Sequence, residues 1–417
     1  MHHQRAEKKK IFFVLSVAIF TSMLGMGIIV PILPLYAETL GASGLWLGAI
    51  FAVFSLARSI AMPFIGRISD RMGRKRFITL GLLVYTLSSV GYIYAGSTIE
   101  LLMVRLIQGF SSAMIIPIAM AFVADISPPN REGNYMGIIS FALFLGFGCG
   151  PLIGGLTKDL TSMEVNFLLM GGLCLLALFL VIIYLPRSGS IEKPPPPLMV
   201  PFSTMLKSRS IMGICFYRFS SAFCRGSIMA FLPLYAHNVL KLTGSQIGLV
   251  IASSILLTAF LQLPFGKLAD KVNRTFLVIA GSVLYFAVVP LIPFTWNFLQ
   301  LLLLNVALGV LGALSLPAAP ALTVEEGKQF GMGTTMAIFN VAMSAGLAIG
   351  PLLSGIILDF WSLPAVFYAC TLLGFFSTGI VYWLFNRPIT PPAPSSPPIA
   401  SPPHVQNAQA GNIAGDI

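Results

Sequence analysis

The sequence predicts an all-α membrane protein whose twelve transmembrane helices form two pseudo-symmetric six-helix halves. Three observations lead to this prediction. The composition is too apolar for a water-soluble chain, the apolar residues fall into twelve long runs, and motifs of the first half recur in the second.

The composition places the chain in a membrane. Of its 417 residues, 56% are hydrophobic and only 9% are charged, and the mean hydropathy is +0.89. Soluble domains are about 25% charged. The net charge of +11 does not indicate nucleic-acid binding, because the basic residues lie between the apolar runs rather than along one soluble face. We expect no nucleic-acid partner and a lipid bilayer as the surroundings.

Each apolar run has roughly the 20 residues that a spanning helix needs. The predicted helices are 11–36, 44–65, 77–96, 100–124, 134–157, 163–185, 210–236, 244–265, 275–294, 298–323, 332–357 and 363–385. They define an N-terminal tail (1–10), an N-terminal half (11–185), a Pro-containing linker (186–209), a C-terminal half (210–385) and a disordered tail (386–417). The first run is too long for the apolar core of a signal peptide.

Orientation follows from the basic residues, which collect in cytoplasmic loops. With the N-terminus inside, most of the 25 Lys and Arg residues fall in inner segments, and the outer loops hold Lys158 and Lys241. We therefore expect a multi-pass protein of the plasma (inner) membrane with both termini, the linker and the tail in the cytoplasm.

The two halves repeat each other. The segment Leu33–Ala37 recurs as Leu232–Ala236, and Gly150-Pro151 recurs as Gly350-Pro351. Asp159 likewise recurs as Asp359. Because an even number of helices separates the copies, the repeats are parallel, which is an architecture of transporters with a midplane site.

One loop carries a specific motif. It runs from Gly66 to Arg76 and resembles the G-x-L-x-D-R-x-G-R-K loop of the major facilitator superfamily. The resemblance implies that this loop closes the cytoplasmic side and that Arg74 pairs with Asp125 and Arg274 with Glu325. The predicted gate and coupling residues are Gly66, Asp70, Arg71, Gly73, Arg74, Asp125, Asp270, Arg274 and Glu325. The second copy is degraded, with Asn273 in place of the second glycine. A simple topology signal and solvated helix-end acids are the alternatives.

Two further motifs resemble the drug:proton antiporters of that superfamily, and together the resemblances cover residues 11–385. Arg105-Leu106-Ile107-Gln108-Gly109 resembles their R-x-x-Q-G motif, and the run from Gly146 to Gly155 resembles the G-x-x-x-G-P-x-x-G-G signature of exporters. Small residues spaced by four let helices cross closely. The predicted packing motif comprises Gly146, Gly150, Pro151, Gly154, Gly155, Gly350 and Pro351. Generic small-residue packing is the alternative.

Four arginines lie inside predicted helices: Arg58, Arg105, Arg218 and Arg225. Each costs roughly 2.5–3.5 kcal/mol on insertion scales, so each needs a partner or a wet cavity. No Asp or Glu lies deep in any predicted helix, and we expect a positively charged central cavity that contains Arg105 and Arg225. The predicted cavity residues are Arg58, Arg105, Gln108, Arg218, Arg225, Gln262, Asn305 and Asn340. Alternatively, these arginines bond carbonyls or amides and are structural.

These patterns predict a secondary active transporter rather than an enzyme. It would export a small anionic or zwitterionic amphiphile by alternating access, as a proton-coupled antiporter. An uptake symporter or facilitator of the same fold, and a flippase for an anionic lipid or lysolipid, are the alternatives. The chain has no G-x-x-x-x-G-K-[ST] motif for ATP. We expect a monomer with protons as a further partner, no cofactor and no metal.

Overall fold

The computed structural model describes residues 2–127, 132–186, 208–330 and 332–386, and side chains from residue 10 on outside 128–133 and 326–334. Over these residues the chain is all α-helical apart from one 3-10 segment and short connections. Apart from Asn386, which is the last residue of α15, the predicted tail 386–417 lies outside the described residues, as does nearly all of the predicted linker.

The helices are α1 (His2–Ile29), α2 (Leu33–Thr39), α3 (Gly44–Met72), α4 (Arg74–Tyr94), α5 (Thr98–Ile126), α6 (Glu132–Leu160), α7 (Met163–Tyr184), α9 (Arg209–Asn238), α10 (Gly244–Ala269), α11 (Arg274–Val288), η1 (Val289–Phe294), α12 (Phe298–Ser315), α13 (Ala318–Phe330), α14 (Met332–Phe360) and α15 (Leu363–Asn386).

Twelve membrane crossings account for these helices. Within the described residues, eleven segments are long and apolar enough to span a bilayer. The twelfth is α9, which has 30 residues but is made more polar by its arginines. The prediction of an all-α, twelve-helix protein is confirmed.

Prolines divide three crossings that the sequence predicts as single helices. The first crossing turns between α1 and α2, where Pro31 and Pro34 lie close together. The ninth ends as the 3-10 segment η1 around Pro290 and Pro293, and the tenth is interrupted at Pro317, between α12 and α13. Proline removes a backbone donor and clashes with the preceding turn, which interrupts a helix.

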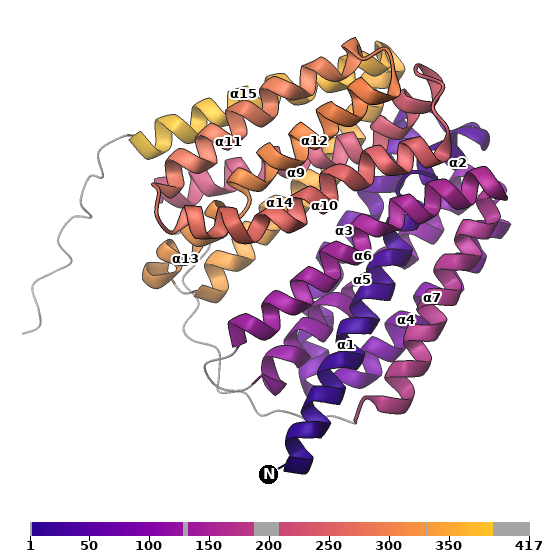
Figure 1. Cartoon of the computed structure of the whole chain (residues 1–417), viewed down its shortest axis with the longest axis vertical. Helices are drawn as coiled ribbons and strands as arrows, with labels where there is room; N and C mark the ends of the chain where they lie inside the picture. Colours follow the sequence, from indigo (N-terminus) through magenta and orange to yellow (C-terminus); the bar gives the residue numbers. More distant parts are fainter. Residues whose placement is uncertain (1, 128–131, 187–207, 331, 387–417) are drawn as a thin grey trace, which may run out of the picture. The chain divides into compact units, whose positions relative to one another are not determined.

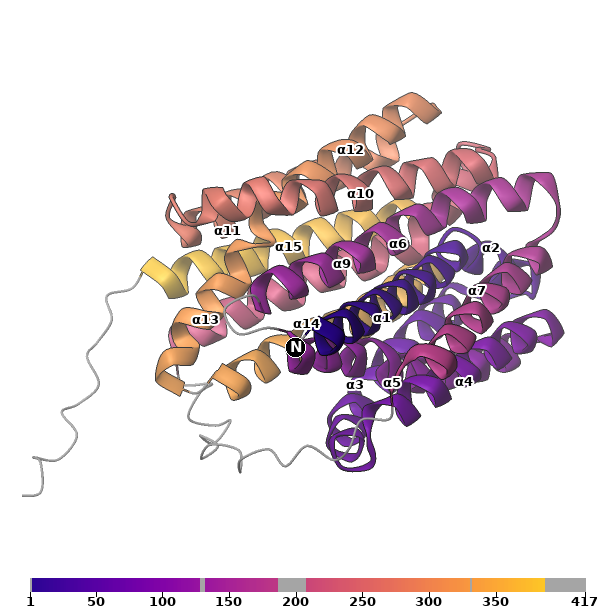
Figure 2. The same cartoon turned by 60° about the horizontal axis from the view of Figure 1, so that its bottom comes forward.

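Three helix pairs of the first half recur in the second. In the first half, α1 packs on α6, α3 on α5 and α4 on both α5 and α7; in the second, α9 packs on α14, α10 on α12 and α11 on α12. Figure 1 shows α4 beside α7, and Figure 2 shows α10 beside α12. Equivalent hydrogen bonds confirm the register of the repeat: Tyr36 Oη donates to the carbonyl of Ala95 (3.0 Å), and Tyr235 Oη donates to that of Thr295 (3.2 Å).

Two equivalent seams join the halves, α3 with α14 and α6 with α10. A Cβ at Gly48 would lie 2.2 Å from the carbonyl oxygen of Pro351, and a Cβ at Gly248 would lie 2.1 Å from that of Pro151. Only glycine permits such close backbone approach. Both seams are therefore closed at the end of the bundle that holds Asp159, called here the Asp159 end. The opposite end, which holds Asp70, is called the Asp70 end.

Candidate transport site

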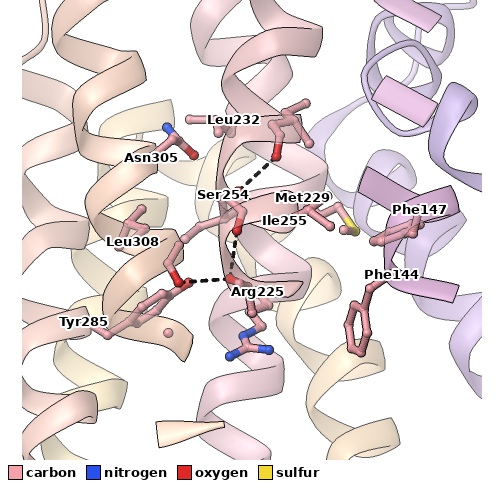
Figure 3. Close-up of a pocket in the computed structure, with 15 residues that line it drawn as sticks. Phe144, Phe147, Arg225, Met229, Leu232, Ser254, Ile255, Tyr285, Asn305 and Leu308 are labelled. Carbon is pink, nitrogen blue, oxygen red and sulfur yellow. Dashed lines mark hydrogen bonds between the residues drawn. The ribbon is translucent and has the colours of Figure 1, made fainter. Parts of the chain in front are cut away.

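A cavity lies between α6 of the first half and α9, α10, α11 and α12 of the second (Figure 3). It contains about 800 Å³ of space between atoms, part of it open to solvent. Phe144 and Phe147 of α6 form one wall. The apolar side chains on the other walls are Ile228, Met229, Leu232, Ile251, Ile255 and Leu308. The cavity therefore suits an apolar or aromatic ligand body.

Arg225 of α9 provides the charge in this cavity (Figure 3). A Cβ at Gly312 would lie 3.6 Å from Nη2 of Arg225 and 3.6 Å from Cε2 of Tyr285, so the guanidinium lies against the bare backbone of Gly312 beside the tyrosine ring. Within the described part of the chain, Arg225 has no hydrogen bond and no ion pair. Its N–H groups can therefore bind an anion, and guanidinium binds carboxylate, sulfonate or phosphate through charge-assisted hydrogen bonds.

Three other polar side chains that line the cavity form hydrogen bonds to backbone carbonyls. Asn305 Nδ2 donates to the carbonyl of Leu301 (3.0 Å), and Ser254 Oγ donates to that of Ile251 (3.0 Å). Thr258 Oγ1 approaches the carbonyl oxygens of Ser254 and Gly309 at 2.7 and 3.0 Å. None of the described residues that line the cavity is acidic. Its electrostatic character is thus positive, through one arginine.

Arg105 and Gln108, which the sequence places in the central cavity, do not line this one. Arg105 is buried inside the first half, where its Nη1 donates to Gln108 Oε1 (2.8 Å) and its guanidinium lies 4.8 Å from the ring centre of Phe54 and 5.2 Å from that of Phe51. Tyr92 Oη donates to the same Gln108 oxygen (2.6 Å). The sequence reasoning missed Tyr92, because nothing in the run of residues links it to the motif.

The remaining predicted cavity residues also lie away from the cavity. Arg218 of α9 stands 4.5 Å from the ring centre of Phe339 and contacts the sulfur of Met343 on α14. Arg58 and Gln262 are half-buried on α3 and α10, and Asn340 is exposed on α14. The structure brings only Arg225 and Asn305 of the predicted set into this cavity.

The predicted gate residues gather at the Asp70 end. Arg74 is buried and forms ion pairs with Asp70 (3.2 Å) and with Asp125. The repeat is visible here too, since Arg274 pairs with Asp270 (3.5 Å) and with Glu325. The two pairings that the resemblance implies are therefore present in the structure.

The glycines of this loop differ in their backbone conformation and in their surroundings. Gly73 joins α3 to α4 with φ +92°, a backbone conformation that side-chain-bearing residues rarely adopt. Asn273, which replaces it in the second half, has φ −55° and caps α11 instead. Among the described residues, a Cβ at Gly66 or Gly266 would meet no atom within 4 Å, and Arg71 is exposed.

Two acids at the Asp159 end join the halves. Asp159, at the end of α6, accepts hydrogen bonds from the backbone N–H groups of Gly244 and Ser245 (both 2.7 Å) at the start of α10. Asp359, at the end of α14, does the same for Gly44 (2.6 Å) and Leu45 (2.8 Å) at the start of α3. The sequence shows this pair as repeat mates but assigns it no function. The recurrence of Asp at the ends of two helices and of Gly at the starts of two others was the sequence pattern that could have indicated these contacts.

Comparison with known proteins agrees with this geometry. The family model of the Major Facilitator Superfamily matches residues 15–244 and again residues 214–410. An uncharacterized MFS-type transporter of Methanocaldococcus jannaschii is 34% identical over 357 residues, which cover 84% of this chain and 92% of that protein. Multidrug resistance protein 2 of Bacillus subtilis is 29% identical over 371 residues, covering 85% of this chain and 90% of the relative.

Among solved structures, a bacterial homolog of the human lysosomal transporter Spinster, in an inward-facing and unoccupied conformation, superposes with a TM-score of 0.78. It is 15% identical and covers 91% of this chain and 97% of its own, so this likeness concerns the fold. The matching family model, the relatives and the two six-helix halves lead to one conclusion: the chain belongs to the major facilitator superfamily and is a multi-pass membrane transporter, not an enzyme.

Proposed function

We propose that this transporter exports a small anionic or zwitterionic amphiphile by alternating access, in exchange for protons. The observation that carries the proposal is Arg225, a guanidinium without a described ion-pair partner in a largely apolar cavity. A cavity of this kind attracts an anion with an apolar body and repels a lipophilic cation.

Export is supported by the relationship to a multidrug resistance protein. The Gly146–Gly155 motif, which resembles that of exporters, supports the same direction. Gly150 packs against Gly27 of α1, and Gly155 packs against Gly244 of the other half. The motif therefore contributes both to packing within its half and to the seam between halves.

Alternating access is supported by the difference between the two ends. At the Asp159 end, Gly44 and Gly244 meet the backbone of the opposite half at close range. At the Asp70 end, a Cβ at Gly66, Gly137 or Gly266 would meet no atom of the described residues within 4 Å. This arrangement is that of a transporter closed at the Asp159 end, and the positive-inside bias assigns that end to the outside.

Proton coupling is proposed for the acids at helix ends. Every Asp and Glu with a described side chain lies in the first or last two turns of a helix or in the adjoining turn. Protons would therefore act on the gates rather than on a carboxylate within the cavity. We propose the plasma membrane as the location, both termini in the cytoplasm, and a monomer as the working unit.

The experiment uses purified full-length protein in proteoliposomes with an imposed pH gradient. A biphenyl sulfonate serves as the anionic probe because it stays ionised and does not leak as a neutral acid. Tetraphenylphosphonium serves as the cation of comparable apolar character. We expect gradient-driven movement of the sulfonate that a protonophore abolishes and that empty vesicles lack. Movement of tetraphenylphosphonium with no movement of the sulfonate would refute the proposal.

Orientation is tested separately in intact cells. Engineered cysteines at Thr161 and Lys241, both exposed at the Asp159 end, should react with an impermeant maleimide. A cysteine at Lys271, exposed at the Asp70 end, should react only after the cells are permeabilised. External labelling at Lys271 would reverse the topology and with it the direction of transport.

A further inference from the structure

The halves correspond residue by residue around the cavity. A Cβ at Gly109 would lie 2.6 Å from the carbonyl oxygen of Phe54, and a Cβ at Gly309 would lie 2.7 Å from that of Ser254. The contact of α5 with α3 is thus repeated by α12 with α10, and position 54 corresponds to position 254. By the same register, Arg105 corresponds to Asn305 and Gln108 to Leu308.

In the first half, the space between α3 and α5 at these positions is filled by side chains. The guanidinium of Arg105 lies near the rings of Phe51 and Phe54 and donates to Gln108. Arg105 is only 5% exposed and Gln108 is fully buried. These four side chains are thus buried and packed against one another.

In the second half, the same four positions hold smaller or less polar side chains: Ile251, Ser254, Asn305 and Leu308. All four line the cavity. Asn305 and Ser254 both turn back to bond carbonyls of their own helices, so neither reaches across. The cavity is therefore the space that an arginine head and an aromatic ring occupy in the other half.

Two polar groups of the cavity, the amide of Asn305 and the guanidinium of Arg225, lie beside opposite ends of a stretch of α12. Asn305, Leu308 and Gly312 lie on one face of this helix, and a rise of about 1.5 Å per residue separates Asn305 from Gly312 by roughly 10 Å. The Arg225 guanidinium lies beside Gly312. Leu308, together with Met229 and Phe147 across the cavity, supplies apolar side chains between the two polar groups (Figure 3).

We infer that this cavity binds an elongated aromatic anion. Its anionic group bonds Arg225, its rings occupy the space that Phe54 and the Arg105 head fill in the first half, and a neutral polar group roughly 10 Å away meets Asn305. This inference rests on the proposed function and specifies its substrate by length, aromaticity and the polarity of the far end. Because the described lining of the cavity contains no acid, a cationic group at the far end gains no ion pair from it.

The test measures equilibrium binding to the purified full-length protein in detergent by isothermal titration, without transport. The probe is 4′-hydroxybiphenyl-4-sulfonate, whose sulfonate and hydroxyl are separated by roughly 10 Å, about the length of α12 from Asn305 to Gly312. Biphenyl-4-sulfonate lacks the hydroxyl, and 4-hydroxybenzenesulfonate lacks one ring. We expect the probe to bind, and loss of the hydroxyl to weaken binding about 5-fold, the effect of one neutral hydrogen bond. The single-ring compound should bind more weakly than either.

Variants separate the elements of the inference. Ser254→Phe copies the first half and should abolish binding by filling the space, whereas Ser254→Ala, which adds no volume, should bind within about 2-fold of the parent because it removes only a hydroxyl already bonded to backbone. Arg225→Gln should weaken binding at least about 10-fold, as loss of a charge-assisted hydrogen bond does. Asn305→Leu should bind both biphenyl compounds equally. Thermal unfolding of each variant verifies that it is folded.

Three results would overturn the inference: equal binding to folded Ser254→Phe and Ser254→Ala, equal binding of one-ring and two-ring sulfonates, or unchanged binding to Arg225→Gln. None of these depends on flux. If binding behaves as expected and the proteoliposomes show no movement, the proposed function fails while the inference stands. Movement of other anions without binding of the probe would refute the inference alone.

Discussion

Asp159 and Asp359 make the same contact in opposite directions. Asp159, in the first half, accepts hydrogen bonds from the first N–H groups of α10 in the second half, and Asp359, in the second half, does so for α3 in the first. A carboxylate at a helix N-terminus satisfies free backbone donors and is favoured by the helix dipole. Both halves are thus joined at one end by two equivalent carboxylate caps.

Removing these caps should open the Asp159 end. We expect Asp159→Ala and Asp359→Ala each to destabilise the closed arrangement by about 0.5–2 kcal/mol, the usual range for loss of a cap, and the double variant to do more. Spin labels at Thr161 and Trp296, both exposed at this end in opposite halves, should report a larger population at long distance. Glu100→Ala is the control, because Glu100 lies at the same end but accepts its hydrogen bond from the backbone N–H of Gly96 in its own half (2.7 Å), and it should leave this distance distribution unchanged.

The glycine seam should be sensitive to a single methyl group. A Cβ at Gly155 would lie 2.1 Å from the carbonyl oxygen of Gly244, and one at Gly355 would lie 2.0 Å from that of Gly44. Gly155→Ala and Gly355→Ala should therefore hold the halves apart at the Asp159 end and slow transport. A Cβ at Gly379 would meet no atom within 4 Å, so Gly379→Ala serves as the control. Normal flux by both seam variants would contradict the close packing.

Arg74 and Arg274 allow the two gate clusters to be compared. The side chain of Arg74 is 2% exposed, whereas that of Arg274 is 27% exposed and its partners Asp270 and Glu325 are more exposed still. Breaking a buried pair leaves a charge without its partner, so Arg74→Ala should lower stability by about 3 kcal/mol. Arg274→Ala should lower it by about 1 kcal/mol or less, as solvent screens exposed pairs. Thermal unfolding in detergent compares the two, and similar losses would refute the difference.

Arg105 and Arg225 should respond in opposite ways to the same change. Arg105→Gln removes the donor to Gln108 within a buried network, and we expect a loss of about 1–3 kcal/mol in stability with little effect on binding of the biphenyl sulfonate. Arg225→Gln should retain stability and lose binding. The same two measurements, thermal unfolding and titration, are made on both proteins. If folded Arg105→Gln lost binding, Arg105 would take part in substrate binding, and the predicted difference between the two arginines would be wrong.

Sequence patterns predicted the fold because the bilayer admits few solutions. Lipid offers no partners for the backbone, so each long apolar run had to be a helix, and the recurring motifs fixed the two halves. The divisions after Ile29 and at Pro317 were not predicted. A helix can continue through a proline, as α9 does through Pro233. Whether a proline interrupts its helix depends on the neighbouring helices.

The candidate site was harder to predict, because all four arginines satisfy the same sequence criterion: each is a charged residue inside a predicted transmembrane helix. What distinguishes them is their neighbours: Arg105 has Phe51, Phe54 and Gln108, whereas Arg225 has the bare backbone of Gly312. The repeat indicates part of this difference between the halves, because aligning positions 54 and 254 shows an aromatic ring in the first half and a hydroxyl in the second. Which of the two locations stays empty depends on side-chain packing that no single-sequence pattern encodes.

The arginines of α9 also affect how the protein is made. This helix begins the second half, and Arg218 and Arg225 each disfavour its entry into lipid by roughly 2.5–3.5 kcal/mol. Arg218 finds the ring of Phe339 and the sulfur of Met343, both on α14, which is synthesised more than a hundred residues later. During biosynthesis α9 should therefore remain at the translocon, or in contact with the first half, until α14 emerges, and truncation before α14 should leave α9 poorly inserted.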